Sequence, residues 1–223
     1  MKEIERNPEA PQLKPRAIEL LTQLCFRQEN SIQKVDAIFA YGTAHFYEDL
    51  AKEITSLLHL GITDKVFLTG GIAESGVDLG HQEPESLLTL KTIDHDSFKS
   101  VRFFTETKST NSLENVTETL KFPEFRIAKK ILMVFKTHDA GRGYLTLRKF
   151  LPEAEILLHS FEVIYPSQTQ PISRDNWHTF KFGISRVWGE FLRIRKYGKR
   201  GDIEYAEVRN LVEELERVLN VVG

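Results

Sequence analysis

Short apolar segments that alternate with amphipathic helical patterns constrain the fold of this 223-residue chain more than any other feature. The segments are brief and rich in β-branched and aromatic residues, as is typical of buried strands. Alternation of strand and helix at this spacing favours a parallel sheet with right-handed crossovers. The expected strands are 35–41, 64–69, 101–104, 131–135 and 156–159; the expected helices between them are 45–60, 83–90, one that begins after Asn111, and one from an N-cap at Asp139 to Phe150.

Two regions lie outside this alternation. The first 14 residues are polar and contain two prolines, and a helical pattern then covers 15–28. After Pro166, two helices are expected at 173–196 and 203–221, separated by 197–201, most simply as a hairpin that covers one side of the sheet. The sequence therefore predicts an α/β protein with about five mainly parallel strands, in three segments: 1–30 tail and helix, 31–165 α/β core, and 166–223 helical extension packed on the core.

Composition narrows the class of protein. Hydrophobic residues make up 41% of the chain, enough for a core, and the net charge is only -2. A nucleic-acid-binding protein usually shows a basic excess, so we expect no nucleic-acid partner and interpret the basic run at 193–200 as a solvated helix end. No apolar segment reaches the roughly 20 residues of a membrane span, and the N-terminus lacks an apolar signal region. We therefore expect a cytoplasmic protein.

Cysteine and histidine usage argues against several chemistries. Cys25 is the only cysteine, which rules out an intrachain disulfide, and its helical spacing with Ile18 and Leu21 indicates a core residue. One cysteine and seven scattered histidines do not form a zinc-binding pattern, so no metal site is expected. The phosphate-binding P-loop, the nucleophile elbow and the dinucleotide fingerprint G-x-G-x-x-G are all absent.

The turns that follow the expected strands carry the candidate site residues. Ligands of open parallel sheets bind beyond the carboxyl ends of the strands, where the strand order reverses, and here the first and fourth strands should lie side by side. Gly42 and Thr43 follow the first strand, and Gly70 and Gly71 follow the second. These turns can offer backbone N–H groups to an anion. The alternative for each glycine is an ordinary tight turn.

The third turn has the most polar side chains. It runs into a helix and supplies five candidate ligand-binding residues: Lys108, Ser109, Asn111, Glu114 and Asn115. The spacing of Asn111 and Glu114 resembles a capping box, so capping alone is the alternative. One cap suffices for one helix, however, and the excess of hydroxyl and amide groups favours ligand binding.

The fourth turn supplies the candidate catalytic residues. His138 follows the fourth strand, where an imidazole can exchange protons near neutral pH. Arg142 lies four residues later and can grip a carboxylate or a phosphate with paired hydrogen bonds. The alternatives are a hydrogen-bonded structural histidine and a surface ion pair.

These turns, taken together, resemble the bacterial SanA/YdcF/ElyC-like family. The resemblance rests on Asp36–Gly42, Thr69–Gly71, Ser109–Asn115, and Thr137-His138 with Arg142. The C-terminal helical part of soluble YdcF-type members is similar to Trp188–Glu190, Arg193, Tyr197 and Gly201–Ile203. The resemblance implies a Rossmann-like three-layer α/β/α sandwich, with residues 31–165 as its Rossmann-like α/β core. It also implies that S-adenosyl-methionine is a candidate ligand, because a soluble member is reported to bind it, and membrane-anchored relatives are linked to envelope integrity.

The function expected from these observations is the binding of a small ligand. An anionic or nucleotide-like group suits His138 and Arg142 better than the positive sulfonium of S-adenosyl-methionine does. Two forms of this function remain open: an enzyme that uses His138 for proton transfer, and a non-catalytic ligand sensor or scaffold linked to envelope physiology.

Overall fold

The computed structural model describes residues 4–220, which fall into two compact units. The sheet unit comprises Glu29–Phe135 and Phe150–Val163. The helical unit comprises residues 4–28, Lys136–Lys149 and residues 164–220. Residues 1–3 of the expected N-terminal tail and Val221 of the last expected helix lie outside the described residues. The border at 163/164 falls near the expected boundary at 165, whereas the assignment of 136–149 to the helical unit is not anticipated by a linear division.

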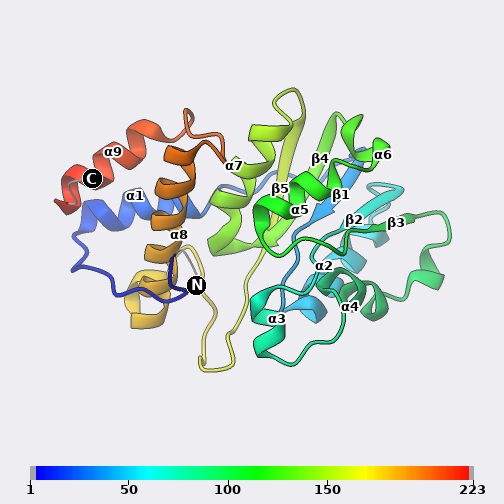
Figure 1. Ribbon diagram of the computed structural model, residues 1–223, viewed down its shortest axis with the longest axis horizontal. Helices are drawn as coiled ribbons and strands as arrows, with labels where there is room; N and C mark the ends of the chain where they lie inside the picture. The colour runs from blue at the N-terminus through cyan, green and yellow to red at the C-terminus, as the bar shows by residue number, and fades with distance from the viewer. Residues whose placement is uncertain (1–3, 221–223) are drawn as a thin grey trace. The chain divides into compact units, whose positions relative to one another are not determined.

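A five-stranded, all-parallel sheet forms the centre of the sheet unit within residues 4–220 (Figure 1). Its order is β3-β2-β1-β4-β5, so the expected neighbourhood of the first and fourth strands is confirmed. Ala40 is in register with Leu68 on one side and with Val134 on the other. The strand order therefore reverses between β1 and β4, as in Rossmann-like folds. The strands are β1 (Ala37–Ala40), β2 (Lys65–Leu68), β3 (Arg102–Thr105), β4 (Lys130–Lys136) and β5 (Glu155–Phe161).

Helices flank this sheet and complete the expected three-layer α/β architecture. The helices between β1 and β3 pack against each other, and right-handed crossovers place them on one face. The chain returns from β3 to β4 in the opposite direction, so its helices cover the other face, where Phe125 stacks on Phe39. The helices of this unit are α2 (Tyr47–His59), α3 (Glu74–Asp78), α4 (Glu85–Thr92), α5 (Ser112–Thr119) and α6 (Pro123–Arg126), with a 3-10 turn η1 (His95–Phe98).

Aromatic residues of successive strands build the core under α6. Phe39, Phe67 and Phe104 occupy equivalent register positions on β1, β2 and β3, and therefore point to the same face. Phe125 is fully buried against the first two of these rings. Burial of one such ring stabilises the fold by roughly 1.5–3 kcal/mol.

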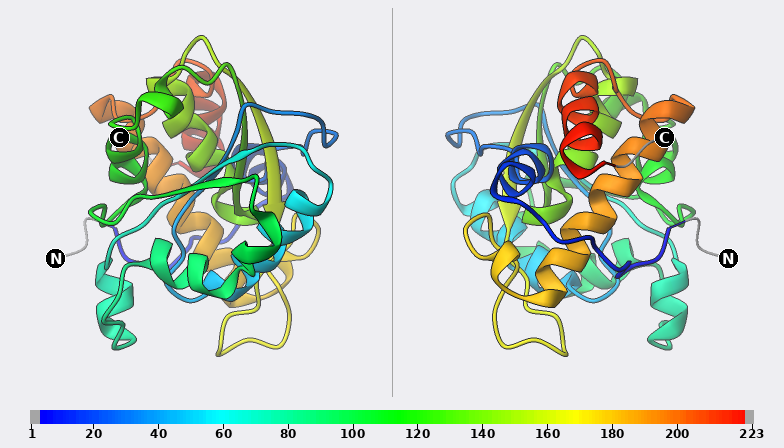
Figure 2. Two further views of the ribbon diagram at one scale, coloured as in Figure 1. Left: turned by 90° about the vertical axis from the view of Figure 1, so that its right-hand side faces the viewer. Right: turned by 90° about the vertical axis from the view of Figure 1, so that its left-hand side faces the viewer.

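The helical unit is built from elements far apart in the sequence. α1 (Pro15–Cys25) packs against both α8 (Lys181–Arg200) and α9 (Arg209–Leu219), as Figure 2 shows. The indole of Trp177 is fully buried and donates to Thr22 Oγ1 at 2.8 Å. Two 3-10 turns, η2 (Thr137–Asp139) and η3 (Trp177–Thr179), precede α7 (Ala140–Phe150) and α8.

Two local predictions about these helices can be compared with the structure. The break expected at 197–201 is wrong, because α8 continues to Arg200 and ends only at Gly201, whose φ of 88° closes the helix in the left-handed conformation. Cys25 is fully buried, which confirms its assignment to the core, and burial raises the pKa of its thiol well above the usual value. No helix within residues 4–220 has both the length and the apolar character needed to cross a membrane.

Candidate functional site

The glycines of the first two turns bring those turns into direct contact in the sheet unit. Gly42 N donates to Thr69 Oγ1 at 3.2 Å, and a Cβ atom on Gly42 would lie 2.6 Å from the carbonyl oxygen of Thr69. Gly70 adopts a φ of 113°, which residues with a side chain rarely tolerate. Close backbone approach therefore explains these glycines without a ligand, and the N–H groups of Gly42, Gly70 and Gly71 donate to protein oxygens.

Glu106 links the second and third turns and is a residue that the sequence analysis missed. It is only 4% exposed and follows directly after β3. Its carboxylate accepts from Gly70 N at 3.2 Å and from Ser109 N at 2.9 Å, and further bonds come from Lys108 N and the Ser109 hydroxyl. This buried charge is held by neutral donors of the two turns, so Glu106 fixes their conformation.

The polar residues of the third turn are engaged with one another. Asn111 Oδ1 accepts from Glu114 N at 3.0 Å, and Glu114 Oε2 accepts from Thr110 N at 2.7 Å, which forms a reciprocal cap at the start of α5. Asn115 is buried and donates its amide to the Ser109 hydroxyl. The side chain of Lys108 is exposed. The capping alternative is therefore observed for Asn111 and Glu114, and a ligand-binding role of this turn stays a prediction.

Two buried hydroxyl groups beside these turns have no hydrogen-bond partner among the described residues. The first is Oγ1 of Thr43, the residue that follows Gly42, and Thr43 is 3% exposed. Ser86 Oγ belongs to a fully buried residue whose backbone N–H donates to Gly70 O. A buried hydroxyl without a partner is costly, so these two atoms mark where the sheet unit can still accept a polar ligand atom or a water.

His138 is enclosed in the helical unit. Its side chain is fully buried, and Nε2 lies 3.1 Å from the hydroxyl of Tyr165. Nδ1 is buried and has no hydrogen-bond partner within residues 4–220. Burial lowers the pKa of His138 to about 3, and the nearby cations Arg186, Lys136 and Arg142 act in the same direction. The imidazole is therefore neutral at physiological pH.

Charged side chains surround this histidine. Asp139 Oδ2 lies 2.6 Å from Lys136 Nζ, and Asp139 Oδ1 lies 3.9 Å from Arg142 Nη2. Burial alone would raise the pKa of Asp139, but Lys136, His138 and Arg142 hold it well below the usual range. Burial would likewise lower the pKa of Lys136, but the carboxylate of Asp139 raises it overall. Both side chains are therefore ionised at neutral pH.

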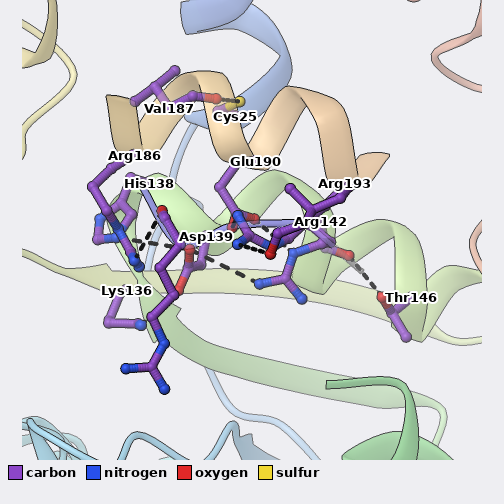
Figure 3. A network of polar contacts seen from close by, with 12 residues as sticks. Cys25, Lys136, His138, Asp139, Arg142, Thr146, Arg186, Val187, Glu190 and Arg193 are labelled. Atoms are coloured by element: carbon purple, nitrogen blue, oxygen red, sulfur yellow. Dashed lines mark hydrogen bonds and ion pairs between the residues drawn. The ribbon is translucent and has the colours of Figure 1, made fainter. Parts of the chain in front are cut away.

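Arg142 is held by a carboxylate on α8. Arg142 Nε donates to Glu190 Oε2 at 2.6 Å, and Arg193 Nη1 donates to Glu190 Oε1 at 3.1 Å (Figure 3). Glu190 is 2% exposed, and its carboxylate bridges the guanidinium groups of Arg142 and Arg193. Burial would lower the pKa of Arg142, but Glu190 and Asp139 raise it overall. The surface ion pair considered for Arg142 is in fact a buried one.

Arg186 is the second residue that the sequence analysis missed. Its Nη2 donates to the Tyr165 hydroxyl at 2.8 Å and its Nη1 to the carbonyl oxygen of Arg6 at 3.5 Å. Its Nε is buried without a partner among the described residues. Burial would lower the pKa of Arg186, whereas Tyr165, Asp139 and Glu190 raise it overall. On the helix expected at 173–196, Arg186 lies opposite the apolar face of Ile184, Val187 and Trp188, so the pattern gave no sign of its contacts.

These residues of the helical unit form one largely buried network of charged side chains. Within residues 4–220 its members bring together four cations and two carboxylates around a neutral histidine. Figure 3 shows the contributions of the segment after β4 and of α8. We call this set the buried network: Lys136, His138, Asp139, Arg142, Arg186, Glu190 and Arg193.

The predicted site residues thus belong to both units. The sheet unit brings together Gly42, Gly70, Gly71, Ser109 and Asn115 through Thr69 and Glu106. The helical unit brings together His138 and Arg142 through Asp139. Within the part of the chain that the structure describes, no group of three or more His, Cys, Asp or Glu side chains is arranged to hold a metal ion.

Comparison with models of known protein families gives no match, and comparison with curated proteins gives none either.

Proposed function

We propose that this protein binds a small ligand that carries an anionic group, and that the buried network of the helical unit holds that group. The observation that carries this proposal is Arg186: within the described residues its guanidinium donates to a phenol and to a distant carbonyl, and its buried Nε has no partner. A charged group with few hydrogen-bond partners in a protein interior is expensive, because the interior screens charge poorly and hydration is lost. An anion that enters such a network gains strong electrostatic attraction and relieves that cost.

The chemistry of the network suits an oxyanion. Guanidinium groups present several N–H donors in a plane and can bind carboxylate or phosphate oxygens in pairs. A nucleotide or another phosphorylated small molecule fits this donor set. S-adenosyl-methionine remains a candidate by resemblance to the SanA/YdcF/ElyC-like family, through its carboxylate rather than its sulfonium. We further propose that the protein belongs to that bacterial family and is located in the cytoplasm.

The state of His138 favours the non-catalytic form of this function. A pKa of about 3 makes the imidazole a weak base, and the ring is fully buried. General bases work best when their pKa lies near the operating pH. The favoured form is therefore a sensor or scaffold in which His138 positions Tyr165. The other candidate is an enzyme in which ligand binding exposes the imidazole ring.

A ligand screen tests the proposal. Differential scanning fluorimetry with nucleotides, phosphate monoesters, dicarboxylates and S-adenosyl-methionine should reveal stabilisation of about 2.7 kcal/mol at a hundredfold excess over Kd. Calorimetric titration then measures the affinity of each ligand that stabilises the protein. If no anionic ligand of the panel stabilises the protein, the proposal is wrong.

A variant separates the two forms of the function. His138→Asn keeps a polar side chain at this position but removes the imidazole. We expect ligand binding to persist in the sensor form, and turnover of a bound ligand, followed by mass spectrometry, to be lost in the enzymatic form. Arg16→Met, which removes an exposed arginine paired with Glu214, is the matched control for nonspecific effects of substitution.

A further inference from the structure

The N-terminal segment lies against α8, the helix that supplies three of the seven residues of the buried network. We call residues 4–8 the N-terminal strap; Figure 2 shows this segment crossing α8. Ser185 Oγ donates to Pro8 O at 2.7 Å, and Arg193 Nη2 donates to Glu5 O at 2.8 Å. A Cβ atom on Gly189 would lie 3.2 Å from Pro8 Cδ, so the strap lies directly on the helix backbone.

The strap offers only neutral oxygens to the cations of α8. Arg193 shares its hydrogen bonds between Glu190 and the Glu5 carbonyl, and Arg186 Nη1 reaches the Arg6 carbonyl at the long distance of 3.5 Å. A carbonyl oxygen carries a partial charge and is a weaker partner for a guanidinium than an anionic oxygen. The strap therefore occupies donor positions without neutralising the positive charge behind them.

Space for a ligand adjoins the strap. A hollow of about 720 Å³ is lined by residues 7–13, by the start of α8 and by Ser185. Its size lies within the usual range for small-molecule sites. Ser185 precedes Arg186 in the sequence and also holds Pro8, so movement of the strap alters both the wall of the hollow and the surroundings of Arg186.

We propose that the anionic group of the ligand is a phosphoryl dianion that displaces the N-terminal strap and takes its place on Arg186 and Arg193. This inference rests on the proposed anion-binding function. Phosphoryl oxygens are charged and can replace the neutral carbonyl oxygens of residues 4, 5 and 6 as acceptors for Arg186 and Arg193. The strap in this account keeps the cations partly hydrogen-bonded while the site holds no ligand, and its release is coupled to phosphate binding.

Calorimetric titration of the full chain with inorganic phosphate tests this inference. Ser185→Ala removes one hydrogen bond that holds the strap, so phosphate should bind about three- to tenfold more tightly to this variant than to the unaltered protein. Ser56→Ala is the matched control, because it also removes a serine hydroxyl bond to a backbone carbonyl but lies in the sheet unit. Phosphate should also accelerate amide hydrogen exchange of residues 4–10 in the unaltered protein.

The outcomes separate this inference from the proposed function. Equal phosphate affinity of the unaltered protein and Ser185→Ala, with unchanged exchange of the strap, overturns displacement and leaves the proposed function intact. Binding of a carboxylate ligand without binding of phosphate overturns the phosphoryl class alone. Failure of every anionic ligand to bind removes the proposed function and this inference together.

Discussion

Glu106 in the sheet unit is a buried charged side chain and Arg186 in the helical unit is a partly buried one, and their hydrogen-bonding needs are met very differently. Glu106 accepts four hydrogen bonds within the described residues, three from backbone N–H groups and one from a hydroxyl. Arg186 donates to one phenol and one distant carbonyl, and its Nε has no partner there. Hydrogen-bond donors of the protein thus surround the Glu106 carboxylate, whereas the Arg186 guanidinium has few acceptors within the described residues.

This difference in hydrogen bonding indicates that Glu106 stabilises the fold and that Arg186 is available to bind an anion. A carboxylate surrounded by donors from two turns stabilises those turns, and its removal would leave buried N–H groups without acceptors. A guanidinium with weak, neutral partners contributes little to stability and keeps its affinity for an anion. We therefore assign an architectural role to Glu106 and a binding role to Arg186.

Removal of the Glu106 carboxylate should have the largest effect. Glu106→Ala leaves three backbone N–H groups unsatisfied, and we expect the free energy of unfolding to fall by about 3–5 kcal/mol. Urea denaturation measures this change. Glu83→Ala, which removes an exposed carboxylate paired with Lys91, should cost less than about 1 kcal/mol. A small loss in Glu106→Ala would contradict the architectural role.

The buried imidazole of His138 should make the free energy of unfolding fall as the pH drops below about 6.5. Its pKa falls from 6.5 to about 3 on folding, so the unfolded chain binds this proton first as the pH drops. The contribution of His138 is thus complete above about pH 6.5 and is lost progressively towards pH 3, at about 1.4 kcal/mol per pH unit. Urea denaturation between pH 4 and 6 should show a shallower dependence in His138→Asn. His59→Asn is the control, because His59 is exposed. If the free energy of unfolding depends on pH equally steeply in both variants, His138 is not a buried neutral imidazole.

Asn111 should act as a helix cap rather than as a contact of the anionic group. Asn111→Ala removes the oxygen that accepts from Glu114 N and should cost about 1 kcal/mol, as measured by thermal denaturation. Affinity for an anionic ligand should stay within about twofold of the unaltered protein. A loss of affinity larger than the loss of stability explains would restore Asn111 to the ligand-binding residues.

Arg186 should tolerate replacement better than any other charged residue of the buried network. Arg186→Met keeps an unbranched apolar stem and removes a charge with weak partners, so we expect a change in unfolding free energy within about 1 kcal/mol, in either direction. Chemical denaturation measures it. A loss of 3 kcal/mol or more would place Arg186 in the same class as Glu106.

Much of the fold could be predicted because each strand carries a local signal. The run at 131–135 is β-branched and apolar, and β4 covers it with one more residue at each end. The place of the first strand beside the fourth followed from the general preference of open α/β sheets, and the pairing of β1 with β4 confirms it. The helix expected at 45–60 is followed by Gly61, whose φ of 62° is the left-handed conformation that glycine favours just after a helix.

The missed site residues lacked a local signal. Glu106 stands in a polar segment that could equally face solvent, and its burial depends on Gly70, which lies 36 residues away. Arg186 reaches Tyr165, 21 residues earlier, and the strap, 180 residues earlier. Contacts of this range are set by tertiary packing, which periodicity and spacing do not encode. The same limit explains why residues 136–149 could not be assigned to the helical unit from the sequence.

The binding of inorganic phosphate to Arg186→Met tests the central claim most directly. If the buried network exists to hold an anion, this variant should remain as stable as the unaltered protein and yet bind phosphate at least tenfold more weakly, because it loses charge-assisted hydrogen bonds. Calorimetric titration beside a denaturation curve measures both quantities on one preparation. Unchanged phosphate affinity in a stably folded Arg186→Met would contradict the account.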